Sequence, residues 1–245
     1  MAVFKCAGAD RGVCDYEAPA AWTRGCPGCG RFYDCKKVGA DKAKEGKKKL
    51  DKLVTTEDPR IATGIKEFDR VIGGGLVAGS SIIFYGPAGV GKSTMALTAC
   101  DGVAKQGLRV LWASGEQSGE DIGKLAGRLK LEHADKIDVL GLEGNAEKII
   151  ETVHEQKIKL LALDSLQKAF MDELDGAVGS TSQCDAVIEH VCFYCKKHGV
   201  AVIIMSHVTR EGGIKGSTGV EHDVDTLLEL DYSYEYDEDG EIDPE

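Results

Sequence analysis

The sequence predicts an α/β fold in which a mostly parallel central sheet is flanked by helices on both faces. Two observations lead to this expectation. From residue 58 onward, short apolar runs alternate with amphipathic segments, which is typical of a parallel sheet covered by helices. One of these runs, residues 81–85, breaks into a glycine-rich turn and then into a helical pattern at residues 94–100. Since 42% of the 245 residues are hydrophobic, one main domain and a small appendage are expected.

Each expected strand is short, apolar and bounded by turn residues. The strands are residues 81–85, 109–113, 137–140, 160–163 and 200–205, and residues 224–230 close the sheet. The helices between them are residues 120–130, 146–157 and 183–197. Ser118 is the expected N-cap of the first, with Asp121 three residues on, and Asn145 precedes the second.

The glycine-rich turn has the spacing of a P-loop, Gly-x-x-x-x-Gly-Lys-Ser. Gly86, Gly89 and Gly91 allow the backbone to curl round a polyphosphate and direct its amides toward it. The Lys92 ammonium would reach the outer phosphates, and the Ser93 hydroxyl would ligate Mg²⁺. The alternative is a glycine loop that binds nothing. The expected ATP-binding residues are Gly86, Pro87, Ala88, Gly89, Val90, Gly91, Lys92, Ser93, Thr94 and Asp164.

Three other strand ends carry candidate catalytic groups. Asp164 ends an apolar strand and would complete the Mg²⁺ site with Ser93, although in isolation it could simply cap the following turn. Glu116 is the candidate general base that would deprotonate water, or else a solvated loop acid. His207, after Ser206, would stand where a γ-phosphate sensor is needed, although a lone histidine is more often structural. Lys92, Glu116 and His207 are thus the expected catalytic residues.

The cysteines divide into two groups. Cys6, Cys14, Cys26 and Cys29 suggest a Zn²⁺ site, in which Cys26 and Cys29 form one tight half, and Cys35 is a spare thiolate that could replace a ligand. A reduced-thiol loop is the alternative. The second C-x-x-C, Cys192 to Cys195, lies in a helical pattern and is interpreted as core packing.

Two loops are candidates for contact with nucleic acid. Residues 208–217 are glycine-rich and basic, and Arg210 and Lys215 in them could contact DNA phosphates. Residues 171–182 are acidic, which makes phosphate contact less favourable. Either loop could instead be a plain solvent-exposed connection.

Charge and hydropathy limit the location and the partners. The net charge is −11, but residues 1–60 hold 13 Lys and Arg against 9 Asp and Glu, and the remainder holds 17 against 32. This acidity lowers the expectation of tight non-specific binding to nucleic acid. No stretch approaches the roughly 20 apolar residues of a membrane span, and no signal peptide begins the chain. A cytoplasmic protein without membrane contact is expected.

Several motifs in the same order resemble the RadA family of bacterial DNA repair proteins, which are RecA-like ATPases. The resemblance runs from Cys6 to about Leu230. It includes the four cysteines, residues 60–76 before the P-loop, residues 114–118, 163–167 and 179–183, and residues 207–212 through 221–226.

The resemblance implies a RecA-like P-loop core with an N-terminal zinc finger, and a DNA-stimulated ATPase that forms a hexameric ring and acts by branch migration. Arg210 or Lys215 would complete the nucleotide site of the next subunit. Family members continue into a Lys-Asn-Arg-Phe-Gly segment and a Lon-protease-like domain, so a short form is expected. The expected boundaries are 1–37 for the zinc-finger module, 38–57 for a basic linker, 58–230 for the ATPase domain and 231–245 for an acidic disordered tail.

Two hypotheses of function follow. The first is a Mg²⁺-dependent and DNA-dependent ATPase of homologous recombination and repair that binds single-stranded or branched DNA. The second is an ATP-switched module that loads or recruits replication or recombination proteins without translocating on DNA. A kinase or clock-like ATPase on the same core is less favoured, since no phosphoacceptor site is evident.

Overall fold

The computed structural model describes residues 3–6, 16–18, 35–38, 59–208 and 223–232. Near the N-terminus, three short strands form an antiparallel sheet in the order β2-β1-β3. They are β1 (Val3–Cys6), β2 (Glu17–Ala18) and β3 (Cys35–Val38). The backbones of Cys6 and Cys35 are register partners in this sheet. Cys14, Cys26 and Cys29 lie outside the described residues, and so do all side chains of a zinc site.

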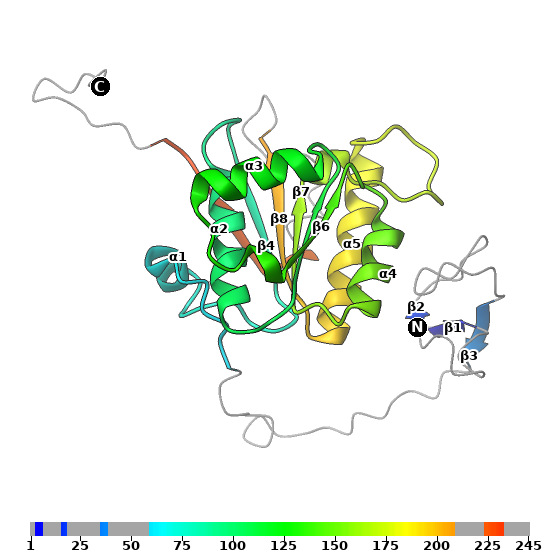
Figure 1. Ribbon diagram of the computed structural model, residues 1–245. Helices are drawn as coiled ribbons and strands as arrows, with labels where there is room; N and C mark the ends of the chain where they lie inside the picture. Colours follow the sequence, from blue (N-terminus) through cyan, green and yellow to red (C-terminus); the bar gives the residue numbers. More distant parts are fainter. Residues whose placement is uncertain (1–2, 7–15, 19–34, 39–58, 209–222, 233–245) are drawn as a thin grey trace, which may run out of the picture.

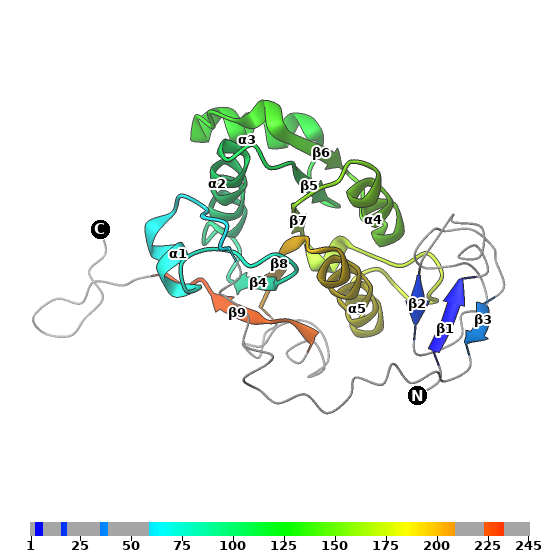
Figure 2. The same cartoon turned by 90° about the horizontal axis from the view of Figure 1, so that it is seen from below.

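The central sheet has six strands, in the order β6-β5-β7-β8-β4-β9, and every described pair within it is parallel. The strands are β4 (Ser81–Gly86), β5 (Val110–Ser114), β6 (Ile137–Gly141), β7 (Leu160–Asp164), β8 (Ala201–His207) and β9 (Thr226–Glu229). The expected parallel sheet is therefore confirmed, and β9 is the expected closing strand. Figure 2 shows β9 beside β4 at the edge opposite β6.

Helices cover both faces of the sheet (Figure 1). α1 (Lys66–Val71), α2 (Lys92–Lys105) and α3 (Gly119–Leu129) pack on one face. α4 (Ala146–Glu155) and α5 (Thr181–His198) pack on the other. Two short 3-10 helices, Ala134–Lys136 and Leu166–Lys168, connect the elements.

Side-chain alternation along the strands builds the two halves of the core. In β5, Leu111 faces the core under α4 and α5, whereas Trp112 faces the core under α2 and α3. In β4, Ile83 and Phe84 divide between the same two faces. All four are fully buried, as expected of strands covered on both sides. This packing fixes the carboxyl ends of the strands, where the site lies.

Local signals set the helix boundaries. The Ser118 hydroxyl accepts a hydrogen bond from the Asp121 amide at 3.2 Å, and the Asn145 side chain accepts one from the Lys148 amide at 2.9 Å. Both expected N-caps are therefore confirmed. The third helix begins earlier than expected, because Ser180 caps it and accepts from the Gln183 amide.

Candidate functional site

The P-loop connects β4 to α2 at the carboxyl edge of the sheet. Gly86 is the last residue of β4 and is the register partner of His207 in β8. Its φ is 151°, and a Cβ there would collide with the Leu230 carbonyl, so only glycine fits. Gly89 and Gly91 have φ values of 84° and 99°, which L side chains rarely adopt. The loop thus has the backbone shape that its sequence predicted.

Lys92 folds back over the loop that precedes it. Its Nζ donates hydrogen bonds to the carbonyl oxygens of Gly86 and Pro87, both at 2.7 Å. Burial lowers the pKa of Lys92, while the negative charges of Asp164 and Glu116 oppose this change. The ammonium is therefore held at the mouth of the loop with two acids near it, where an incoming phosphate would meet it.

Ser93 and Asp164 meet across two elements. Ser93, in the first turn of α2, donates its hydroxyl hydrogen bond to Asp164 Oδ2 at 2.8 Å. Asp164 ends β7, is 7% exposed, and has a raised pKa because burial disfavours its charged form. A hydroxyl and a carboxylate this close are the hard oxygen donors that Mg²⁺ prefers, so these residues fit a magnesium ion.

Glu116 lies beside this pair, in the loop after β5. One of its oxygens, Oε1, accepts a hydrogen bond from the Ser165 hydroxyl, and the same oxygen is 3.8 Å from His207 Nε2. The side chain of Glu116 is 33% exposed, so water can reach it. A carboxylate fixed by a buried hydroxyl and open to water on another side can orient a water molecule and take its proton.

A second layer of polar groups, which the sequence analysis did not assign, supports this edge. Gln167 donates from Nε2 to Ser206 Oγ at 2.8 Å and accepts from the His207 amide at 3.3 Å through Oε1. Ser165 and Ser206 are both buried. The sequence signal was the run that follows Asp164, Ser165-Leu166-Gln167, which contributed to the family resemblance without a role for each residue.

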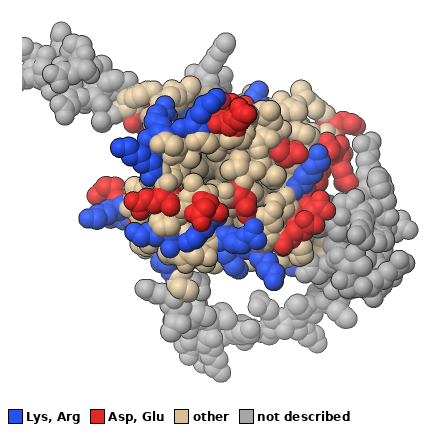
Figure 3. All heavy atoms as spheres, viewed as in Figure 1, with Lys and Arg blue, Asp and Glu red and all other residues tan. Residues whose placement is uncertain are grey.

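These groups line a cavity of about 530 Å³, a size that suits a nucleotide. One wall comes from α3, which the sequence analysis did not connect with the site. The α3 residues in the wall are Asp121, Lys124, Leu125 and Arg128. On the face of the molecule seen in Figure 3, basic and acidic side chains are interspersed among the described residues.

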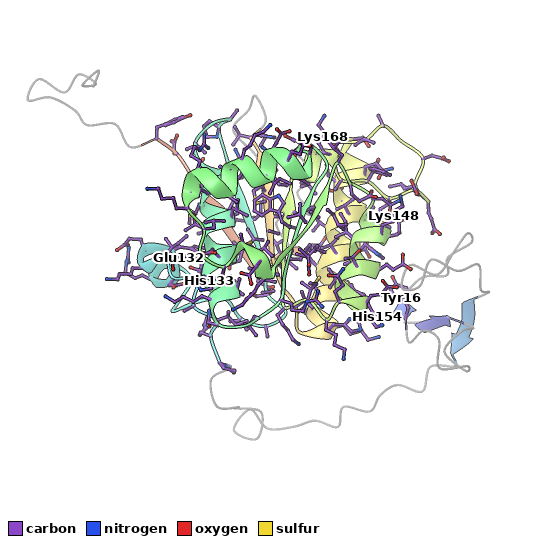
Figure 4. The ribbon with its side chains drawn as sticks, viewed as in Figure 1. Tyr16, Glu132, His133, Lys148, His154 and Lys168 are labelled. Carbon is purple, nitrogen blue, oxygen red and sulfur yellow. The ribbon has the colours of Figure 1, made fainter. Side chains whose placement is uncertain are left out.

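Other polar residues that could bind metal lie away from this edge. His133 contacts Asp101, and His154 Nδ1 lies 2.7 Å from the Tyr194 hydroxyl, both far from Lys168 at the carboxyl edge in Figure 4. No cluster of three or more His, Cys, Asp or Glu side chains suited to a metal occurs among the described residues. Arg210 and Lys215 lie outside the described ranges.

The second cysteine pair behaves as expected. Cys192 and Cys195 are buried free thiols in the core beneath α5. Burial raises the pKa of Cys192 to about 12 and that of Cys195 well above its ordinary value. Both thiols are thus kept protonated, and their interpretation as core packing is confirmed. Within the described residues, no helix is both long and apolar enough to span a bilayer.

Known proteins resemble this chain in both sequence and fold. RadA of Aquifex aeolicus, described as a DNA repair protein, is 36% identical over 225 residues, which are 89% of this chain and 50% of that protein. RadA of Escherichia coli is 36% identical over 183 residues, which are 75% of this chain and 39% of that protein. The chain thus spans about half or less of these relatives' length.

A solved structure described as an ATPase domain superposes with a TM-score of 0.62 at 14% identity, and the match covers 75% of this chain and 80% of that one. This likeness confirms the expected RecA-like fold. A family model described as an AAA domain matches residues 47–213, which include the P-loop, Glu116, Asp164 and His207. Because this match extends over more than half of the sequence, the chain belongs to the AAA domain family.

Proposed function

We propose that the chain is a Mg²⁺-dependent ATP hydrolase that binds DNA and acts in recombination and repair. The observation that carries this proposal is the convergence of Lys92, Ser93, Asp164 and Glu116 on one cavity. The described repair role of the RadA relatives supports the choice of pathway.

Each residue has a defined task in hydrolysis. The amides of the P-loop and the Lys92 ammonium bind the β- and γ-phosphates, and Ser93 and Asp164 hold Mg²⁺. When bound, Mg²⁺ neutralises charge on the phosphate oxygens. Glu116 orients the attacking water and accepts its proton at Oε2, since Oε1 already accepts from Ser165. His207 lies at the end of β8 and contacts the γ-phosphate.

DNA binding is assigned to the segment that follows β8. Arg210 and Lys215 come three and eight residues after His207 in the sequence, so a change at the γ-phosphate has a short covalent path to them. The same two residues are the candidates to complete the site of a neighbouring copy in a homo-oligomer, for which a hexameric ring is proposed. Recombination or replication proteins are proposed as further partners, in the cytoplasm.

The N-terminal module is proposed to bind Zn²⁺ through Cys6, Cys14, Cys26 and Cys29, with Cys35 as the alternative to one of them. The proposed domain boundaries are those given by the sequence: 1–37, 38–57, 58–230 and 231–245. The antiparallel pairing of β1 with β3 supports a small folded unit in the first of these segments.

The test is the rate of ATP hydrolysis with and without single-stranded, duplex and branched DNA, measured together with the mass in solution. Hydrolysis should depend on Mg²⁺, rise with at least one of these DNAs, and be lost in Lys92→Ala. Hydrolysis that no DNA stimulates would contradict the DNA-dependent role while leaving the ATPase assignment intact. Hydrolysis that survives Lys92→Ala would contradict the assignment of the site itself.

A further inference from the structure

The segment that follows β9 lies against the P-loop. β9 pairs with β4 as far as Glu229, the register partner of Tyr85. The Leu230 amide then donates to the Tyr85 carbonyl at 2.8 Å, and the Leu230 carbonyl lies directly against Gly86. We refer to residues 230–232 as the strap. No strap residue is among those that line the nucleotide cavity, so the strap contacts the loop from outside that cavity.

Tyr232 carries the strap to the tip of the loop. Its hydroxyl donates a hydrogen bond to the Ala88 carbonyl at 3.1 Å. The same oxygen would lie 3.5 Å from a Cβ built on Gly89, so it is in contact with the backbone there. The side chain is 46% exposed, and the hydrogen bond is therefore formed at the expense of a contact with water.

Three successive carbonyls of the loop accept hydrogen bonds from side chains. Lys92 donates to those of Gly86 and Pro87, and Tyr232 donates to that of Ala88. Lys92 must share its donors with the phosphates once a nucleotide binds, whereas the Tyr232 contact involves no atom of the ligand. In a loop whose glycines permit many conformations, a contact that survives binding reduces the ordering cost of binding.

We propose that Tyr232 is a positioning residue that holds the P-loop in its nucleotide-binding shape and thereby sets nucleotide affinity. This inference rests on the proposed nucleotide site. The role differs from that of a tyrosine that only packs the strap against β4, because it predicts an effect on affinity without an effect on folding. It also differs from a catalytic role, because the hydroxyl touches no reacting atom.

The test compares two substitutions that each remove one hydroxyl. Tyr232→Phe removes the hydrogen bond to the loop and keeps the ring. Tyr85→Phe is the matched control, since its hydroxyl donates to Glu229 at 3.3 Å and holds the strap to β4 without touching the loop. The probes are Mg²⁺ with ADP in calorimetry and Mg²⁺ with ATP in turnover assays on the full chain.

Tyr232→Phe should weaken ADP binding about three- to tenfold, the usual effect of one hydrogen bond. The KM for ATP should rise by the same factor while kcat stays unchanged, because the lost contact acts equally on bound substrate and transition state. Thermal unfolding without nucleotide should match the parent, and Tyr85→Phe should bind ADP within about twofold of the parent.

Two results would overturn the inference alone: unchanged ADP affinity in Tyr232→Phe, or equal weakening in Tyr85→Phe. A fall in kcat at unchanged KM would also overturn it, since the hydroxyl would then act in the chemical step. If the parent protein takes up no ADP with Mg²⁺, the proposed nucleotide site fails and the inference fails with it.

Discussion

The Ser93 hydroxyl and the Asp164 carboxylate are joined by a 2.8 Å hydrogen bond, although 71 positions separate them in the sequence. The bond links the first turn of α2 to the end of β7. Because β7 does not pair with the P-loop strand β4, and β8 lies between the two, the contact depends on the order of three strands. It is therefore a sensitive reporter of whether the catalytic edge is assembled.

Replacement of Asp164 by Asn should weaken Mg²⁺-dependent nucleotide binding. The amide keeps a hydrogen-bond acceptor for Ser93 but removes the negative charge that a cation requires. We expect at least a tenfold loss of the Mg²⁺-dependent part of ADP affinity, by analogy with the effect of altering a metal's surroundings. Calorimetric titration of ADP with Mg²⁺ and with EDTA measures it, and an equal loss in both would contradict the assignment.

The same substitution should affect stability in a pH-dependent way. Burial raises the pKa of Asp164 above its ordinary value of 3.8, so folding favours the protonated form. The parent thus has its full stability from this group below pH 3.8 and loses it as the pH rises through the higher folded pKa. In urea unfolding without nucleotide, Asp164→Asn should be more stable than the parent at pH 7, and this advantage should disappear at about pH 3.5.

Replacement of Glu116 by Gln should slow hydrolysis and leave binding in place. Removal of a general base typically costs about 10²- to 10⁴-fold in rate, and Gln retains the acceptor for the Ser165 hydroxyl. Single-turnover ATP hydrolysis gives the rate, and ADP calorimetry gives the affinity. A residual rate within about threefold of the parent would fall short of that range and would identify Glu116 as a solvated loop acid.

His190 should make the protein sensitive to acid. It is buried with no hydrogen-bond partner for Nε2 in the described part of the chain, and burial lowers its pKa from 6.5 to about 4. The unfolded chain therefore binds the proton first, and stability is lost as the pH falls from 6.5 to about 4. The full effect corresponds to about 3 kcal/mol.

Two uncharged replacements, His190→Leu and His190→Gln, test this expectation. Both should lose less stability than the parent between about pH 7 and pH 4.5 in chemical denaturation. Since all other titrating groups are common to the three proteins, curves of equal slope would show that His190 does not cause the acid sensitivity.

The zinc hypothesis gives a stoichiometric prediction. The purified chain should contain one zinc per protein by elemental analysis, and the double substitution of Cys26 and Cys29 by Ser should remove it. Cys192→Ala is the control and should retain the metal, because that thiol is buried in the core and kept protonated. Zinc retained after loss of the tight half-site would exclude this ligand set.

The strands and the P-loop were predictable because their signals are local. Apolar runs such as 160–163 and 200–205 give the buried strands, and Gly86, Gly89 and Gly91 give the turn. The chain ends of parallel strands gather at one edge, and this rule alone brought Glu116, Asp164 and His207 together. α1 was not assigned, because it is only six residues long and Phe68 is its buried residue.

The supporting polar groups were not predictable, because their contacts are made between distant segments. Gln167 meets Ser206 across 39 positions, and Ser165 meets Glu116 across 49. These pairs depend on β7 lying between β5 and β8, a strand order that no local pattern specifies. The α3 wall was missed for a similar reason: Lys124 and Arg128 have the spacing of an ordinary solvated helix face.

The late position of β9 bears on how the protein is synthesised. The strand that feeds the P-loop is flanked on one side by β9, whose neighbour Asp225 binds the amide of Ser81 from 144 positions later. Until the ribosome has delivered that segment, β4 presents an open edge of unpaired amides and carbonyls, which is a recognised route to mispairing between nascent chains. The nucleotide site is therefore among the last features to mature, and chaperone demand should be greatest shortly before Asp225 emerges.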